Sequence, residues 1–271
     1  MNKKQKALAL TAAAIGAGVL AWGNTSISTT EYTITSPRLP RAFHGLRIAQ
    51  VSDLHNDLFG SDYSRLVRAL KQANPHFIAI TGDMLDARRT NIPRALLAAE
   101  KMLTVAPCLY VKGNHEARTP GYPLFEEGLL RTGVHVLRNR AVTLEHKGET
   151  FTVMGMDCPY GDPEYPAFLY KIREETDDFI LLLSHHPEEF DTYTRVGMDL
   201  VLCGHIHGGQ VRLPMLGGVI APHQGFFPKY DAGLYEQGNT RMIISRGLGN
   251  SLCPLRVNNR PELVVVELRC E

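Results

Sequence analysis

Short apolar runs alternate with longer amphipathic stretches through most of the chain, beginning near Leu46. Runs of four to six apolar residues predict buried strands, and longer stretches with helical periodicity predict helices. The first half contains strand-like runs at 46–51, 77–81 and 108–111 and helix-like stretches at 63–73, 93–103 and 124–132. This alternation predicts an α/β domain whose parallel strands are joined by helical crossovers.

The second half is richer in strands. Its strand-like runs lie at 134–137, 141–144, 151–154, 179–183, 200–203, 242–245 and 263–268. The first three predict a meander, and the scarcity of long helices here suggests a second sheet packed on the first. Residues 24–45 begin with a stretch rich in Ser, Thr and Pro and are predicted to form a connector or edge strand. Residues 46–271 are predicted to form one domain.

The N-terminus has a different character from the rest. Lys3, Lys4 and Lys6 precede 16 residues, 7–22, that carry no charge. Such a run is about 24 Å long as a helix, shorter than the ~20 residues that span a bilayer core comfortably. Residues 1–23 are therefore predicted to be a signal peptide or an uncleaved signal-anchor. Either would place the remainder outside the cytoplasmic membrane, secreted to the cell envelope or anchored at the membrane.

The composition is that of a globular protein, with 44% hydrophobic and 21% charged residues. Because 29 Lys and Arg nearly balance 28 Asp and Glu, charge gives no support to a nucleic-acid partner, and none is expected. The five cysteines are scattered without a Cys-x-x-Cys pair, so neither a zinc ribbon nor a disulfide framework is indicated. Cys108 and Cys203 lie in apolar runs and are expected to be buried thiols.

Polar side chains follow five of the predicted strands directly. They are Asp53 and His55, Asp83 and Asp86, Asn114 and His115, His185 and His186, and His205 and His207. The first three clusters are 30 and 31 residues apart, counted from Asp53 to Asp83 to Asn114, and one strand–helix–strand unit takes about 30 residues. Since ligands bind at the carboxyl ends of strands in open α/β sheets, the clusters are expected to converge in one crevice.

The chemistry of these clusters favours metal ions. Carboxylates, imidazoles and an amide, without thiolates, suit divalent Mn, Fe, Zn or Co. The set exceeds the ligands of one site, so two ions sharing a bridging carboxylate are predicted. Two ions ~3.5–4 Å apart lower the pKa of a bound water and stabilise the oxygens of an in-line displacement, as phosphoryl transfer requires. Each motif alone is typical of a turn or a helix cap. Five such motifs in order, each at the end of a predicted strand, are together a specific signal for a metal centre.

The series Asp-x-His, Gly-Asp-x-x-Asp, Gly-Asn-His-Glu, His-His-Pro and Gly-His-x-His resembles the calcineurin-like metallophosphoesterase family, from about Leu46 to the C-terminus. The later segments Gly-Gly-Gln, Ser-Arg-Gly-Leu-Gly and Leu-Arg-Val-Asn-Asn-Arg-Pro-Glu are similar to its YkuE/YaeI-type branch of exported or membrane-tethered bacterial phosphodiesterases. The resemblance implies a four-layer α/β/β/α sandwich and hydrolysis by a hydroxide that bridges two divalent ions. The implied substrate is an envelope phosphate ester: a phospholipid, a nucleotide-linked lipid or sugar, or a cell-wall phosphate.

The resemblance also implies roles for individual residues. One metal would be held by Asp53, His55, Asp83 and His207. The other would be held by Asp83 as the bridge, with Asn114, His185 and His205; His186 remains the alternative to His185. His115 would protonate the leaving oxygen or bind the phosphoryl group, and Asp86 would orient the His115 ring through a hydrogen bond.

Some features stay open. Arg212, Arg246, Arg256 and Arg260 are candidates for phosphate contacts. The apolar stretch 213–227 is expected to be a packed loop or hairpin, the alternative being a lip for an acyl chain or a membrane contact. A non-catalytic metal- or ligand-binding envelope protein is the alternative function, although such a protein should lack some of the clustered residues. The chain has no Gly-x4-Gly-Lys-Ser/Thr, Gly-x-Ser-x-Gly or His-x-His-x-Asp-His motif, which disfavours a P-loop NTPase, a serine hydrolase and a metallo-β-lactamase.

Overall fold

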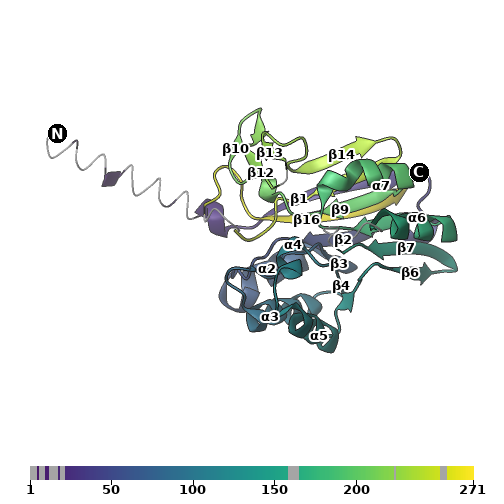
Figure 1. The fold of residues 1–271 in the computed structure, drawn as a ribbon, viewed down its shortest axis with the longest axis horizontal. Coiled ribbons are helices and arrows are strands. Elements are labelled where there is room, and N and C mark those ends of the chain that lie inside the picture. The colour runs from purple at the N-terminus through teal and green to yellow at the C-terminus, as the bar shows by residue number, and fades with distance from the viewer. Residues whose placement is uncertain are drawn as a thin grey trace.

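Two mixed β-sheets pack face to face, with helices on both outer faces (Figure 1). The computed structural model describes residues 22–157, 165–222, 224–250 and 255–271, together with Gln5, Leu10, Thr11 and Gly18. The order of layers is helix, sheet, sheet, helix, which confirms the α/β/β/α sandwich that the family resemblance implies.

The first sheet has six strands, of which β2 to β5 run parallel. Its order is β1 (Ser28–Ser36), β16 (Glu262–Cys270), β2 (Leu46–Val51), β3 (Phe77–Ile80), β4 (Cys108–Tyr110) and β5 (His135–Val136). The crossover helices are α2 (Ser64–Ala73), α3 (Ile92–Leu103) and α5 (Tyr122–Thr132). Each crossover returns the chain to the same end of the sheet, so the loops that follow β2, β3 and β4 meet at one edge.

Strand β1 ties the N-terminal segment to the end of the chain. It pairs with β16 in parallel over nine positions, from Ser28 with Glu262 to Ser36 with Cys270. The segment 24–45, expected to be a connector or edge strand, thus supplies the edge strand of the first sheet, and the folded domain begins before Leu46.

The second sheet also has six strands. Its order is β14 (Gly233–Gln237), β15 (Thr240–Ile244), β9 (Leu200–Cys203), β8 (Ile180–Leu183), β7 (Glu149–Gly155) and β6 (Arg140–His146). Its outer face carries α6 (Tyr165–Glu175) and α7 (Phe190–Val196). The meander expected to begin at residue 134 is wrong in its first strand: β5 pairs with β4, Leu109 opposite His135, and belongs to the other sheet.

Both faces of each sheet are covered, which explains the continuous apolar runs in the sequence. Along β16, Leu263 and Val265 face the helices of the first layer, whereas Val264 and Val266 face the second sheet. These four side chains are at most 1% exposed. The rigid double sheet holds the loops at its edge in fixed positions.

The buried cysteines behave as the sequence predicts. Cys108 and Cys203 are free thiols with no exposed surface. Burial raises the pKa of Cys108 to about 12, so this thiol is an inert core side chain. Cys158 and Cys253 lie outside the described residues.

Two short hairpins project from the end of the second sheet (Figure 1). They are formed by β10 (Arg212–Leu213) with β11 (Gly217–Gly218) and by β12 (Ile220–Ala221) with β13 (Gly225–Phe226). The stretch 213–227 was expected to pack, yet Leu216 is 66% and Phe226 is 74% exposed. The hairpin form of this stretch is therefore confirmed, but its packing is wrong, because these side chains lie on the outside of the hairpins.

The predicted signal peptide or signal-anchor, residues 1–23, falls almost entirely outside the described residues. Among the residues that are described, none of the helices combines the length and apolar character needed to cross a bilayer.

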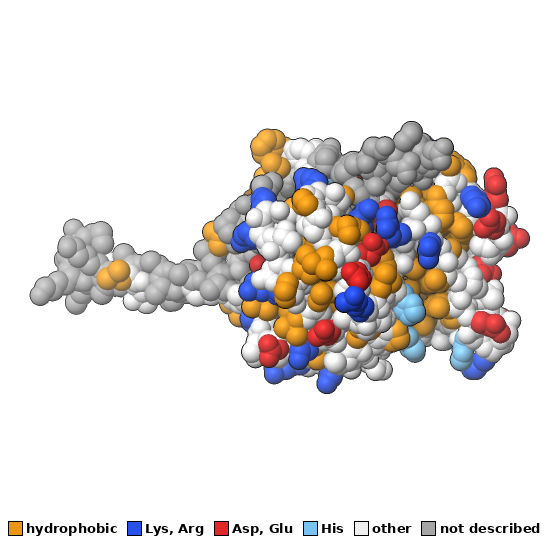
Figure 2. All heavy atoms as spheres, turned by 60° about the horizontal axis from the view of Figure 1, so that its bottom comes forward, with side chains coloured by type: hydrophobic (Ala, Val, Ile, Leu, Met, Phe, Trp, Pro, Cys, Tyr) orange, Lys and Arg blue, Asp and Glu red, His pale blue; other side chains and the backbone are white. Residues whose placement is uncertain are grey.

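The face brought forward in Figure 2 mixes Lys and Arg with Asp and Glu side chains and shows no broad area of one sign.

Candidate metal centre

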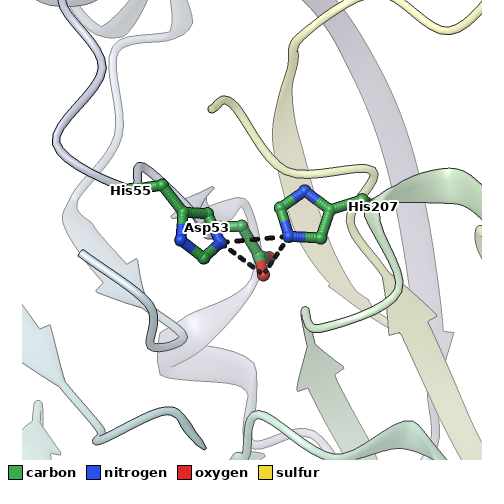
Figure 3. A group of neighbouring side chains, drawn as sticks. All are labelled: Asp53, His55 and His207. Atoms are coloured by element: carbon green, nitrogen blue, oxygen red, sulfur yellow. Dashed lines mark hydrogen bonds and ion pairs between the residues drawn. The ribbon is translucent and has the colours of Figure 1, made fainter. Parts of the chain in front are cut away.

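The loops after β2 and β9 bring Asp53, His55 and His207 together (Figure 3). The Nε2 atom of His207 lies 3.4 Å from Asp53 Oδ1 and 3.0 Å from His55 Nε2. His55 Nε2 lies 3.9 Å from the same oxygen. Donor atoms about 2.1 Å from one tetrahedral ion are separated by about 3.4 Å. The three atoms are therefore spaced as ligands of a single ion would be.

A second group forms where the loops after β3, β4, β8 and β9 meet. His185 Nε2 lies 3.2 Å from Asp83 Oδ2, 3.2 Å from His205 Nδ1 and 3.1 Å from Asn114 Oδ1. The same Asp83 oxygen lies 3.6 Å from His55 Nε2 in the first group. Asp83 thus stands between the two groups, in the position that a bridging carboxylate occupies.

The side-chain amide of Asn114 is held between the second group and Arg118. If rotated by half a turn, its nitrogen would donate to His185, His205 and Asp83, each at 3.1 Å, and its oxygen would accept from Arg118. Only the oxygen of an amide can bind a cation. An ion held by the second group would therefore require the orientation in which Oδ1 faces His185.

The structure distinguishes His185 from His186. The His186 ring pairs with Glu188, whose Oε1 lies 2.9 Å from Nδ1. His186, Glu188 and His205 also offer three atoms within 4.8 Å of one another, so this group is compatible with a cation by itself. Only His185, however, contacts the carboxylate shared by both groups, which makes His185 the better candidate ligand. The ligand roles remain predictions.

The loops that carry these side chains are strained. Five of the candidate ligands have left-handed backbones: Asp53 (φ 54), His55 (φ 48), Asp83 (φ 53), His205 (φ 75) and His207 (φ 51). Such a conformation costs a non-glycine residue on the order of 1–3 kcal/mol and persists only where the surroundings enforce it. A concentration of strain at one sheet edge is typical of a functional site.

Two glycines in the motifs allow the loops to approach closely. A Cβ on Gly113 would overlap the carboxylate of Asp83, and a Cβ on Gly204 would overlap Ser52 Oγ and Asp53. The Asp53 carboxylate in turn accepts hydrogen bonds from Ser52 Oγ at 2.6 Å and from the His205 backbone N–H at 3.1 Å. These glycines are needed for the position of the carboxylates rather than for a turn.

Burial and mutual charge set the protonation of the groups. Burial lowers the pKa of both His55 and His207 to about 3, so these rings are neutral and able to bind a cation through nitrogen. For His185, burial acts to lower the pKa, but the Asp83 carboxylate raises it to about 10. The buried Asp83 carboxylate therefore requires positive charge beside it, which a divalent ion would supply.

His115 lies beside the two groups, its ring centroid 4.5 Å from that of His55. The backbone N–H of Ala87 donates to His115 Nδ1 at 3.1 Å, which leaves the proton of the neutral ring on Nε2. Burial lowers the pKa of His115, which favours that neutral form.

The hydrogen bond expected between Asp86 and His115 is not formed. Asp86 Oδ1 lies 3.7 Å from Nδ1, and Ala87 occupies the hydrogen-bonding position instead. The Asp86 carboxylate accepts from the backbone N–H of Arg88 at 2.9 Å and pairs with the guanidinium groups of Arg88 and Arg89 at 3.3 and 3.2 Å. Asp86 therefore positions Arg88, while Ala87 orients the His115 ring.

A pocket of about 560 Å³ opens over the centre. Its polar wall includes His115, Arg88 and Arg118, and its apolar wall includes Ile220 and Ala221. Arg88 and Arg118, which sequence reasoning missed, are the cations that line it. The only signal for Arg88 is its place directly after the Gly-Asp-x-x-Asp motif.

The four arginines proposed for phosphate contacts lie elsewhere. Arg212 pairs with Asp231 at 2.9 Å and Arg246 with Glu262 at 2.8 Å. The guanidinium of Arg260 lies 4.4 Å from the ring centroid of Trp22. None of these lines the described pocket.

Arg256 is buried behind the centre, only 2% exposed, and its Nη2 lies 3.2 Å from His207 Nδ1. Glu116, the last residue of Gly-Asn-His-Glu, is also fully buried. Its carboxylate accepts from the backbone N–H groups of Asp83 at 2.8 Å, Leu85 at 2.8 Å and Gly113 at 3.0 Å. Glu116 thereby fastens the loop after β3 to the loop after β4.

Comparison with known proteins gives concordant results. The family model described as calcineurin-like phosphoesterase matches residues 46–209. The chain is 33% identical to the uncharacterized metallophosphoesterase YkuE of Bacillus subtilis, over 90% of this chain and 86% of that protein. It is 31% identical to the phosphodiesterase YaeI of Escherichia coli, over 82% of each chain. Among solved structures, TT1561 of Thermus thermophilus has the same fold, with a TM-score of 0.52 at 14% identity, over 75% of this chain and 90% of that chain.

Proposed function

Because the chain belongs to the calcineurin-like phosphoesterase family and is a metal-dependent phosphoester hydrolase, we propose that it is a phosphodiesterase that uses two divalent ions. Its substrate would be a phosphate ester of the cell envelope, encountered outside the cytoplasmic membrane. The observation that carries the proposal is the position of Asp83, whose Oδ2 lies 3.2 Å from His185 and 3.6 Å from His55. Membership of this hydrolase family disfavours the alternative function, a non-catalytic binding protein.

Two ions fit the donor set. The first group offers Asp53, His55 and His207, and the second offers His185 and His205, with Asp83 reachable from both. Nitrogen and oxygen donors without thiolates suit Mn, Fe, Zn or Co. When bound, such ions would supply Lewis acidity to the phosphoryl oxygens and lower the pKa of a water molecule.

The chain's own residues would bind and orient the ester. Arg88 and Arg118 line the pocket and would neutralise the charge of the phosphoryl group. Asp86 Oδ1 accepts from the backbone N–H of Arg88 at 2.9 Å and lies 3.3 Å from its Nε, so the loop and the guanidinium are both positioned in advance. The neutral His115 ring would donate a hydrogen bond through its Nε2–H to the leaving or phosphoryl oxygen, because its Nδ1 already accepts from the N–H of Ala87.

The shape of the pocket supports a diester with a nonpolar substituent. A phosphodiester carries two organic groups, whereas a monoester carries one and an additional negative charge. The lining of the pocket also includes Ile220, Ala221 and Pro222, which would accommodate an apolar group. The similarity to a protein named phosphodiesterase also favours a diester. A phospholipid or a nucleotide-linked lipid suits this wall better than a cell-wall polyol phosphate.

The location rests on the N-terminal sequence. Three lysines precede 16 uncharged residues, an arrangement that directs the following chain across the membrane. Fractionation of cells that express the full chain tests this directly. Recovery of the protein in the soluble cytoplasmic fraction would refute an extracytoplasmic location.

Hydrolysis of bis(p-nitrophenyl) phosphate and p-nitrophenyl phosphate, assayed with added Mn²⁺ or Zn²⁺, tests the activity. We expect a higher kcat/KM for the diester and loss of both activities in Asp83→Asn. Asp62→Asn is the control, since Asp62 is exposed and has a left-handed backbone (φ 47) that asparagine tolerates. Preference for the monoester would overturn the diester assignment, and full activity of Asp83→Asn would overturn the metal assignment.

A further inference from the structure

An exposed apolar surface lies beside the mouth of the pocket. It consists of Met215, Leu216, Ile220, Phe226 and Phe227, here called the hairpin patch, and the exposed fraction of these residues is at least 47%. In Figure 2, hydrophobic side chains protrude at the upper left edge of the body, the end at which Figure 1 draws the hairpins. Contiguous exposed side chains of this size mark an interaction surface.

The hairpin patch is rigidly joined to the catalytic edge. The backbone N–H of Val219 donates to Val211 at 2.9 Å, and that of Phe227 donates to Val219 at 2.9 Å, so the two hairpins form one unit. Gly209, two residues after His207, packs so closely on Gly218 that a Cβ on either would clash. The patch residue Ile220 also lines the pocket. The apolar surface therefore continues into the substrate site.

The same surface lies next to the point where the N-terminal segment joins the domain. The side chain of Asn24 pairs with the backbone of Arg256, through N–H to Oδ1 at 2.7 Å and Nδ2 to O at 3.1 Å. The following residue, Val257, bridges to Val211 beside β10. The uncharged sequence 7–22 thus leads into the domain at the end that carries the hairpins.

The charges around the hairpin patch favour anionic headgroups. Arg212 pairs with Asp231 at 2.9 Å, which leaves the exposed Lys229, two residues after Phe227, as a cation that borders the patch. Trp22, an aromatic residue of the type enriched at membrane interfaces, is 58% exposed at the same end and stacks with Arg260. An apolar centre with a lysine and an exposed tryptophan beside it suits a surface that binds anionic bilayers.

We propose that the hairpin patch inserts into the boundary between headgroups and acyl chains of an anionic phospholipid bilayer, so that the pocket opens onto the membrane surface. The proposal rests on the proposed function only in its consequence: a diester held in the bilayer would enter along Ile220 without crossing water. Binding itself requires no catalysis, so binding and activity are tested separately.

The chain contains a single tryptophan, which allows each surface to be probed by itself. In the full chain, Trp22→Phe combined with Phe226→Trp places the probe in the hairpin patch. Trp22→Phe combined with Leu124→Trp places it on α5, where Leu124 is 63% exposed, as the matched control. The vesicles contain phosphatidylcholine and phosphatidylglycerol with brominated acyl chains, which quench only tryptophans that reach the acyl region.

We expect strong quenching and a blue shift for the Phe226→Trp probe and neither for the Leu124→Trp probe. Leu216→Ser with Phe226→Ser should weaken vesicle binding about tenfold or more, since two apolar side chains leave the bilayer, while hydrolysis of soluble bis(p-nitrophenyl) phosphate stays unchanged. An unquenched Phe226→Trp probe, or equal quenching of both probes, would overturn the proposal. So would a dimer that dissociates on Leu216→Ser with Phe226→Ser, because a second copy would then cover the patch.

Discussion

The guanidinium of Arg256 lies against the outer nitrogen of His207, with Nη2 3.2 Å from Nδ1, while Nε2 of the same ring faces Asp53 at 3.4 Å. This contact fixes the position of the ring, so that Nε2 is the nitrogen that faces the metal centre. Arg256 is itself fixed, since its side chain is buried and its Nη1 donates to the carbonyl of Arg246 at 2.8 Å. The orientation of His207 therefore depends on a residue 49 positions away.

Arg256→Lys should lower metal affinity about 10- to 100-fold, the usual cost of losing a partner that orients a metal ligand. Lysine keeps the charge but not the fork that reaches both His207 and the carbonyls. Competition with a chelating indicator measures this affinity without an activity assay. Arg260→Lys, whose guanidinium stacks on Trp22 away from the centre, is the control. Unchanged affinity in Arg256→Lys would show that the ring is oriented by other contacts.

Asp86→Asn separates two roles for this carboxylate. If Asp86 positions Arg88, as their 3.3 Å contact indicates, the variant should resemble Arg88→Ala, with KM raised about tenfold and metal content kept. If Asp86 instead orients His115, the variant should lower kcat and leave KM unchanged. Steady-state kinetics of Asp86→Asn, Arg88→Ala and His115→Asn, measured side by side, decide between them.

His115→Asn should keep the metals and lower kcat by about 100- to 1,000-fold, the range for loss of one hydrogen-bond donor to a developing negative charge. The loss should be larger for diesters with alkyl leaving groups than for p-nitrophenyl esters, because p-nitrophenolate departs without a proton. A loss of equal size for both kinds of ester would assign His115 to phosphoryl binding instead.

Gly113→Ala should abolish most activity although glycine carries no chemistry. Its Cβ would overlap the Asp83 carboxylate, so Asp83 must move from its place between the two groups. We expect an activity loss of about 100-fold, the scale of a 1 Å misplacement in an active site, together with reduced metal content. Gly23→Ala, where a Cβ meets nothing within 4 Å, is the control. Normal metal content in Gly113→Ala would mean that the loop relaxes around the methyl group.

The convergence of the five clusters could be predicted from the sequence because strand order constrains it. Strand–helix–strand crossovers return the chain to one sheet edge, so Asp53, Asp83 and Asn114 had to meet there once the spacing was recognised. The residue types then indicated a metal centre. Only the choice between His185 and His186 depended on where a strand ends, which sequence determines poorly.

Contacts made by loops could not be predicted in the same way. Nothing in the sequence shows that the N–H of Ala87 takes the hydrogen-bonding position at His115 in place of Asp86. The burial of Arg256 behind His207 depends on how the last loop folds back over the domain. The two-residue pairing of β5 with β4 and the exposure of Phe226 likewise follow from tertiary structure, since short apolar segments carry too little pattern to assign.

The central claim is that side chains from distant parts of the chain hold two ions that share Asp83. Anomalous diffraction from crystals grown with Mn²⁺ measures this directly. The account predicts two peaks about 3.5–4 Å apart, the spacing of two-metal sites, one beside Asp53 and His207, the other beside His185 and His205. A single peak distant from Asp83, or none at saturating Mn²⁺ in a catalytically active crystal, would contradict it.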